Sequence, residues 1–188
     1  MFALRSAALG LMLGVSTTSL GDVMTDAVVK RYPVEGTTMT AVLRSLSERS
    51  PLVERTGQRH YGVTRVAFEQ SATFQEIPDG CELLSNDIDL KLEVVLPEWV
   101  DRDRAKPQLV RLWDKLEEDI TQHEQRHVEI AQESHAEMRE KLDRYITADT
   151  CDALRERVRS DLKTMIEEHR RRQLAFDEAT LANRPNSP

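Results

Sequence analysis

The sequence lacks the features that mark several common classes of protein. Only 5% of its 188 residues are aromatic, and no apolar run is long enough to span a bilayer. It contains no Gly-rich phosphate loop, no G-x-S-x-G turn and no C-x-x-C pair. A net charge of -7 gives the chain no electrostatic reason to bind nucleic acid or anionic lipid. We therefore expect no nucleic-acid partner, no stable membrane anchor and no cysteine zinc site.

Apolar periodicity predicts strands early in the chain and long helices late in it. Residues 28–50 read as a short strand followed by a helix, for which Thr38 is the predicted N-cap. Residues 59–70 and 83–96 alternate between apolar and polar residues, which is typical of half-buried strands. Two long amphipathic patterns follow, one beginning near Pro107 and one over 152–181. The predicted fold class is α+β, with a small antiparallel sheet packed against a long antiparallel helical hairpin.

The most informative motif is His123-Glu124-Gln125-Arg126-His127, an H-E-x-x-H sequence within the first long helical pattern. Histidines four residues apart project from one helix face and can bind one zinc ion. The glutamate beside the first histidine lies 100° round the helix, where it can act as a general base toward water held by the metal. The motif thus predicts Zn²⁺ as cofactor, with His123 and His127 as ligands and Glu124 as catalytic residue. The alternative is a pair of core histidines hydrogen-bonded to the sheet.

A catalytic zinc ion needs a third protein ligand, which the motif itself does not supply. If the helical hairpin turns near residue 148, residues 170–174 should lie beside 123–127. His169 is near that level and in the apolar stripe of the second helix, so it is the first candidate. Asp177 is the alternative third ligand, one or two turns further on, and His60 in a predicted strand is a weaker candidate.

Taken together, these residues resemble the bacterial predicted secreted zinc-dependent proteases, a family also described as domain of unknown function 922. The shared features, in chain order, are Val34-Glu35-Gly36-Thr37-Thr38, Gly80-Cys81, Leu96-Pro97-Glu98-Trp99, Trp113, the H-E-x-x-H motif, Cys151 and Phe176-Asp177-x-x-Thr180. The resemblance implies an exported, single-zinc peptidase-like protein. The chain departs from the pattern at Ala182-Asn183, where relatives tend to have a His-Gly pair. If that histidine binds metal in relatives, this chain has lost a ligand.

The two ends of the chain and its cysteines bear on export. Residues 1–21 read as a signal peptide, cut before Asp22; an uncleaved amphipathic N-terminus is the alternative. The predicted zinc peptidase-like domain is 22–183, and 184–188 is a disordered tail. In an exported chain, Cys81 and Cys151 would form one disulfide, whereas in the cytoplasm both would be free thiols. No lipid-anchor cysteine follows the leader.

The function expected from the sequence is therefore a periplasmic or secreted zinc metallopeptidase. Its substrate would be a peptide or protein, hydrolysed by a zinc-activated water. Two alternatives remain, a zinc-binding pseudo-peptidase without catalysis and a helical interaction module without metal. The sequence does not indicate a substrate preference or an oligomeric state.

Overall fold

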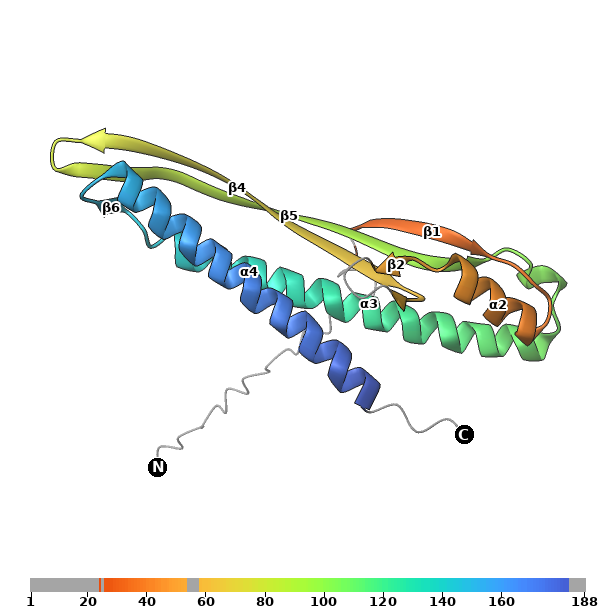
Figure 1. The fold of residues 1–188 in the computed structure, drawn as a ribbon. Helices are drawn as coiled ribbons and strands as arrows, with labels where there is room; N and C mark the ends of the chain where they lie inside the picture. Colours follow the sequence, from red (N-terminus) through yellow and green to blue (C-terminus); the bar gives the residue numbers. More distant parts are fainter. Residues whose placement is uncertain (1–23, 25, 54–57, 183–188) are drawn as a thin grey trace, which may run out of the picture.

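The chain folds into an elongated α+β structure in which long helices lie along one face of a long β-hairpin (Figure 1). The computed structural model describes Met24, residues 26–53 and residues 58–182. The signal peptide expected over 1–21 and the tail expected over 184–188 lie outside these residues. The elements, in order, are β1 (Val28–Val34), α2 (Met39–Arg49), β2 (Leu52–Val53), β3 (Gln58–Arg59), β4 (Val63–Ile77), β5 (Gly80–Trp99), a 3₁₀ turn (Arg102–Arg104), α3 (Pro107–Leu142), β6 (Thr147–Ala148) and α4 (Cys151–Ala182).

The main sheet has the order β1-β5-β4, with β6 pairing with β5, and it is mixed. Strands β4 and β5 form the predicted antiparallel pair, but β1 runs parallel to β5 from Val28 beside Glu93 to Val34 beside Trp99. The prediction of a purely antiparallel sheet was therefore wrong. Alternation of apolar residues reports which face of a strand is buried and is the same for both directions. The direction is set by the long connection through α2 and β4, which returns the chain to the same end before β5 begins.

The β4–β5 hairpin is the longest feature of the sheet. Both strands extend further toward the hairpin turn than predicted, whereas β4 begins at Val63 rather than at residue 59. The hairpin turns at Pro78-Asp79, where proline and aspartate favour a turn. Gly80 follows with φ at +143°, and a Cβ at this position would lie 2.2 Å from the carbonyl oxygen of Ala148. Only glycine allows β5 to begin here against β6.

The helices begin where their capping residues predict. Thr38 accepts a hydrogen bond from the backbone N–H of Ala41 at the start of α2, and Pro107 occupies the first turn of α3. Lys141 of α3 forms an ion pair with Asp161 of α4. Further contacts between the two helices lie nearer the start of α3 and nearer the end of α4. The two long helices therefore pass each other in opposite directions. No helix in the described part of the chain is both long and apolar enough to cross a membrane.

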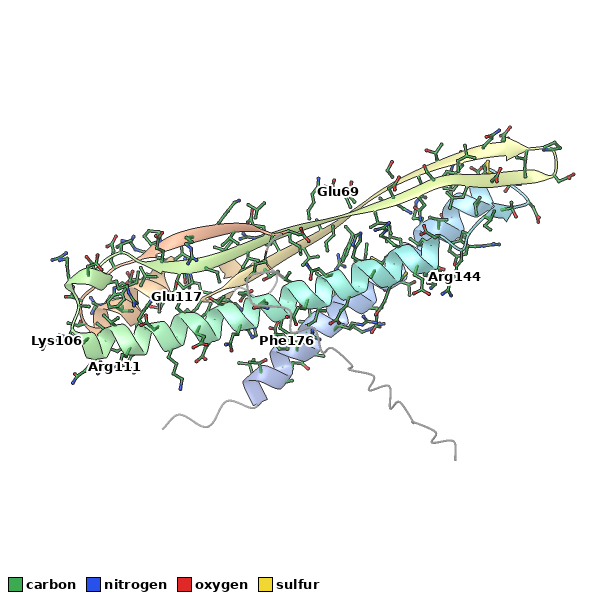
Figure 2. The ribbon with its side chains drawn as sticks, turned by 180° about the vertical axis from the view of Figure 1, so that it is seen from behind. Glu69, Lys106, Arg111, Glu117, Arg144 and Phe176 are labelled. Atoms are coloured by element: carbon green, nitrogen blue, oxygen red, sulfur yellow. A yellow bond between two sulfur atoms is a disulfide. The ribbon has the colours of Figure 1, made fainter. Side chains whose placement is uncertain are left out.

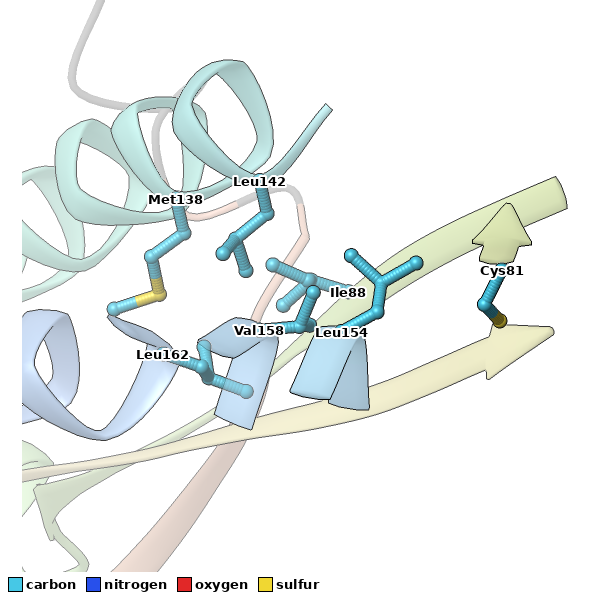
Figure 3. Packing of buried hydrophobic residues seen from close by; sticks show 7 residues of the cluster. All are labelled: Cys81, Ile88, Met138, Leu142, Leu154, Val158 and Leu162. Atoms are coloured by element: carbon cyan, nitrogen blue, oxygen red, sulfur yellow. The ribbon is translucent and has the colours of Figure 1, made fainter. Parts of the chain in front are cut away.

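The core is divided into three clusters along the length of the molecule. The cluster nearest the hairpin turn is drawn in Figure 3 and joins β5, α3 and α4; its buried members are Cys81, Ile88, Met138, Leu142, Leu154, Val158 and Leu162. At its edge Cys81 and Cys151 form the predicted disulfide, with their Cα atoms 4.8 Å apart. A disulfide is consistent with an oxidising, extracytoplasmic compartment.

Candidate metal centre

Three side chains from the two long helices converge on one point. His123 and His127 lie one turn apart on α3, so their rings face the same side, and Asp177 approaches from α4. The Nε2 atoms of the two histidines are 3.1 Å apart. Asp177 Oδ1 is 3.2 Å from His123 Nε2 and 3.0 Å from His127 Nε2. Among the described residues, this is the one group of three potential metal-ligating side chains close enough to share an ion.

The spacing of these atoms fits a small divalent cation. Ligand atoms at about 2.0–2.1 Å from a tetrahedral zinc ion lie roughly 3.3 Å from one another, close to the observed separations. Two imidazoles and one carboxylate are also a donor set that zinc accepts in catalytic sites. The His127 side chain is 12% exposed, whereas His123 and Asp177 are 28% and 35% exposed. Solvent therefore reaches one side of the group, where a fourth ligand can bind.

The charges of the three groups are strongly coupled. Burial opposes ionisation of Asp177, but hydrogen bonds from His123 and His127 outweigh it and hold the pKa of the carboxyl well below its usual range. Burial likewise opposes protonation of His127, but its hydrogen bonds to Asp177 and Gln173 outweigh it and raise the pKa of the imidazole. The site thus attracts positive charge, either a proton or a metal cation.

Glu124 lies beside this group without belonging to it. Glu124 is 3% exposed, and its carboxylate turns toward the start of β4, where Thr64 Oγ1 donates a hydrogen bond of 2.8 Å to Oε2. The backbone of Gly62 passes so close that a Cβ there would lie 2.7 Å from Glu124 Oε1. Burial raises the pKa of Glu124, and the nearby histidines and Thr64 partly offset the rise. A buried carboxylate with a raised pKa, next to a candidate metal-binding group, has properties that suit a general base.

An aromatic ring from α4 supports both histidines. Phe176 stacks on His123 with ring centroids 4.8 Å apart and meets His127 edge-on at 5.1 Å. Figure 2 labels Phe176 where α4 passes α3. The ring limits rotation of both imidazoles, so the ligand atoms are held in place by packing as well as by hydrogen bonds.

His169, the first candidate for the third ligand, is not part of the converging group. Its ring is 5% exposed, and its Nδ1 lies 3.2 Å from Ser134 Oγ. The structure places Gln173 beside His127 and Asp177 beside both histidines, so His169 lies two turns before Asp177, roughly 12 Å along α4. The hairpin register expected from equal helix rises was about one turn short, and the alternative ligand, Asp177, occupies the position.

Gln173 also lies at the site, although no sequence motif indicated a role for it. Its Oε1 contacts His127 Nδ1, and its Nε2 donates a hydrogen bond of 3.0 Å to the backbone carbonyl of His127. The available signal was its position, one turn after His169 and one turn before Asp177 on the same helix face. A neutral glutamine side chain is not a typical zinc ligand, so its position on this helix face did not by itself indicate a role at the site.

The remaining histidines stand apart from the converging group. His135 Nε2 lies 2.6 Å from the carbonyl oxygen of Ile88, so this ring links α3 to β5. His60 precedes β4, and its buried Nε2 has no hydrogen-bond partner among the described residues. Tyr61, adjacent to Gly62, has its carbonyl oxygen fixed by the hydroxyl of Tyr32 at 2.8 Å.

Comparison with known proteins adds the family. The sequence profile of one bacterial family, described as a bacterial protein of unknown function (DUF922), matches residues 29–183. This range contains the whole of the sheet apart from Val28, and all of the candidate metal centre. No curated protein and no solved structure matches the chain. Because the match covers most of the sequence, the chain belongs to the DUF922 family of bacterial proteins.

Proposed function

We propose that the protein is an exported zinc metallopeptidase with a single metal ion held by His123, His127 and Asp177. The observation that supports it best is the mutual spacing of 3.0 to 3.2 Å among three ligand atoms supplied by two different helices. These three side chains would supply three protein ligands without a histidine at position 182. The disulfide and the expected leader support export to the periplasm or beyond.

The residues of the chain then divide the work of peptide hydrolysis. A zinc ion held there would lower the pKa of a water molecule and polarise the carbonyl of the scissile bond. Glu124 takes a proton from the attacking water and passes it to the leaving nitrogen as the C–N bond breaks. Thr64 fixes one carboxylate oxygen by its hydrogen bond, so the other remains available for the proton. The water oxygen is retained in the new carboxyl group.

The central test compares two variants of untagged protein, each with a matched control. Wild type should bind one zinc ion and hydrolyse labelled casein. Asp177→Asn should weaken zinc binding by more than about a hundredfold, beyond the usual effect of losing an outer-shell contact. Glu124→Gln should keep the zinc and reduce hydrolysis by about 10²–10⁴-fold, the usual contribution of a general base. Asp152→Asn and Glu118→Gln, both exposed, should change neither measurement.

The outcomes separate the proposal from its alternatives. Equal hydrolysis by wild type and Glu124→Gln would remove the catalytic role of the glutamate. Stoichiometric zinc without hydrolysis of any protein would identify a non-catalytic zinc-binding module. A wild type that binds no zinc and melts at the same temperature with and without chelator would leave only a helical interaction protein.

A further inference from the structure

A line of hydrogen bonds crosses from α3 to α4 and returns to a candidate zinc ligand. It begins on α3, where the hydroxyl of Ser134 donates to the carbonyl oxygen of Ile130 at 2.8 Å. Ser134 Oγ is also 3.2 Å from His169 Nδ1. A serine hydroxyl has one hydrogen, and here it is used on the carbonyl. His169 must therefore donate through Nδ1.

The direction of the next bonds follows from that first one. In a neutral imidazole with hydrogen on Nδ1, the other nitrogen can only accept. His169 Nε2 lies 3.4 Å from Gln173 Nε2, which donates to it. The same amide nitrogen donates to the backbone carbonyl of His127 at 3.0 Å, and a carbonyl can only accept. Two acceptors thus fix the NH₂ end of Gln173, and its Oε1 is left facing His127 Nδ1.

We propose that Gln173, anchored by His169, is a positioning residue that holds the proton of His127 on Nδ1 and leaves the Nε2 lone pair free for zinc. The inference rests on the proposed metal site. It adds a reason why the hydrogen of the His127 imidazole lies on Nδ1 and not on Nε2. Without Gln173, Asp177 Oδ1 at 3.0 Å would favour hydrogen on Nε2. That tautomer blocks the atom that must bind metal, because zinc requires an unprotonated nitrogen.

The surroundings of His169 suit a fixed, neutral anchor. The ring is buried and meets the edge of Phe68 with centroids 5.1 Å apart. Burial, with the positive charges of Arg172 and Arg170, lowers the pKa of His169 to about 4. The imidazole is therefore uncharged at neutral pH and keeps an acceptor nitrogen for Gln173. His169, which the sequence suggested as a zinc ligand, would thus support the ligand His127 indirectly, through Gln173.

The test uses the full mature chain and two independent measurements. The first is the position of the imidazole hydrogens in metal-free protein, read from long-range ¹H–¹⁵N NMR spectra recorded above the pH at which the His127 signals stop changing, where its imidazole is neutral. We expect wild-type His127 and His169 to carry hydrogen on Nδ1. Gln173→Leu should move the His127 hydrogen to Nε2. Gln108→Leu, an exposed glutamine at the start of α3, should have no effect.

The second measurement is zinc affinity, determined by competition with a chelator. Gln173→Leu should bind zinc about 10–100-fold more weakly than wild type, the usual effect of losing the outer partner of a ligating histidine. Ser134→Ala, which releases His169 from its donor role, should weaken binding by a smaller factor. The melting temperature of each metal-free variant shows whether it has folded.

Two results would overturn the inference. One is a wild-type protein with the His127 hydrogen on Nε2, which needs no variant to observe. The other is a folded Gln173→Leu protein with unchanged tautomer and unchanged affinity. A wild type that binds no zinc would instead overturn the proposed metal site, and the NMR measurement distinguishes this case because it is made without metal.

Discussion

At the scale of residues, neighbouring positions of one helical turn serve different purposes because they face different surroundings. His123 and His127 face α4 and remain partly exposed, whereas Glu124 faces the sheet and is almost fully buried. The buried side is built for a carboxylate, since Thr64 donates to it and Gly62 leaves room for it. The same turn of α3 therefore separates the proposed metal ligands from the proposed base.

Removing the hydroxyl of Thr64 tests this division. Thr64→Val keeps the size of the side chain but leaves Glu124 Oε2 without its donor, and a lost hydrogen bond to a charged group costs about 1.5–3 kcal/mol. We expect hydrolysis at neutral pH to fall by roughly 10–100-fold while zinc affinity stays within about twofold. Thr73→Val, an exposed position on the same strand, is the control. A parallel loss of zinc would show that Thr64 supports the ligands rather than the base.

At the scale of elements, the sequence predicted the helices and the presence of two long strands, because their signals are local. Thr38, Pro107 and the turn at Pro78-Asp79 mark boundaries through short-range geometry. The direction of β1 and the register between α3 and α4 depend on contacts between distant segments. The predicted register differed from the observed one by about one helical turn, which placed His169 rather than Asp177 beside the two histidines.

The packing of α4 on α3 and the sheet should make stability depend on pH through His169. Burial and the charges of Arg172 and Arg170 lower its pKa to about 4, against 6.5 for the ordinary group; Phe68, Ser134, Gln173 and His127 are the other groups around it. Between these two values the unfolded chain binds a proton that the folded chain does not. The contribution of His169 to the free energy of unfolding should therefore be fully present above about pH 6.5 and decrease as the pH falls toward 4.

Urea unfolding in the presence of chelator measures this effect. The free energy of unfolding of wild type should be about 2 kcal/mol lower at pH 5 than at pH 8 because of His169, since each pKa unit corresponds to about 1.4 kcal/mol. His169→Gln should lose less over the same interval, by about that amount. An identical pH dependence in both proteins would show that His169 does not resist protonation in the folded state.

At the scale of the whole molecule, the disulfide and the candidate metal centre lie near opposite ends of α4. Cys151 begins the helix, and Asp177 lies 26 positions later, roughly 39 Å along its axis. The disulfide closes a loop across a sequence separation of 70, for which chain entropy predicts a stabilisation of about 4 kcal/mol. The two features should therefore act separately on stability and on metal binding.

Replacing both cysteines by serine tests that separation. We expect the free energy of unfolding of the double variant to be about 2–4 kcal/mol lower than that of wild type, while zinc affinity stays within about threefold. Reductant should destabilise wild type to a similar extent and leave the double variant unchanged. A loss of zinc affinity in step with stability would mean that the two ends of α4 are coupled.

The proposed ion has a further consequence because its ligands come from two helices. Loss of the ion would remove the link that it makes between α3 and the last turns of α4, while the disulfide would still hold the first turn of α4. A shortage of zinc would then affect the structure of the protein as well as its hydrolytic activity. It would expose the loosened end of the helix to proteases, so that inactivity and degradation would begin together.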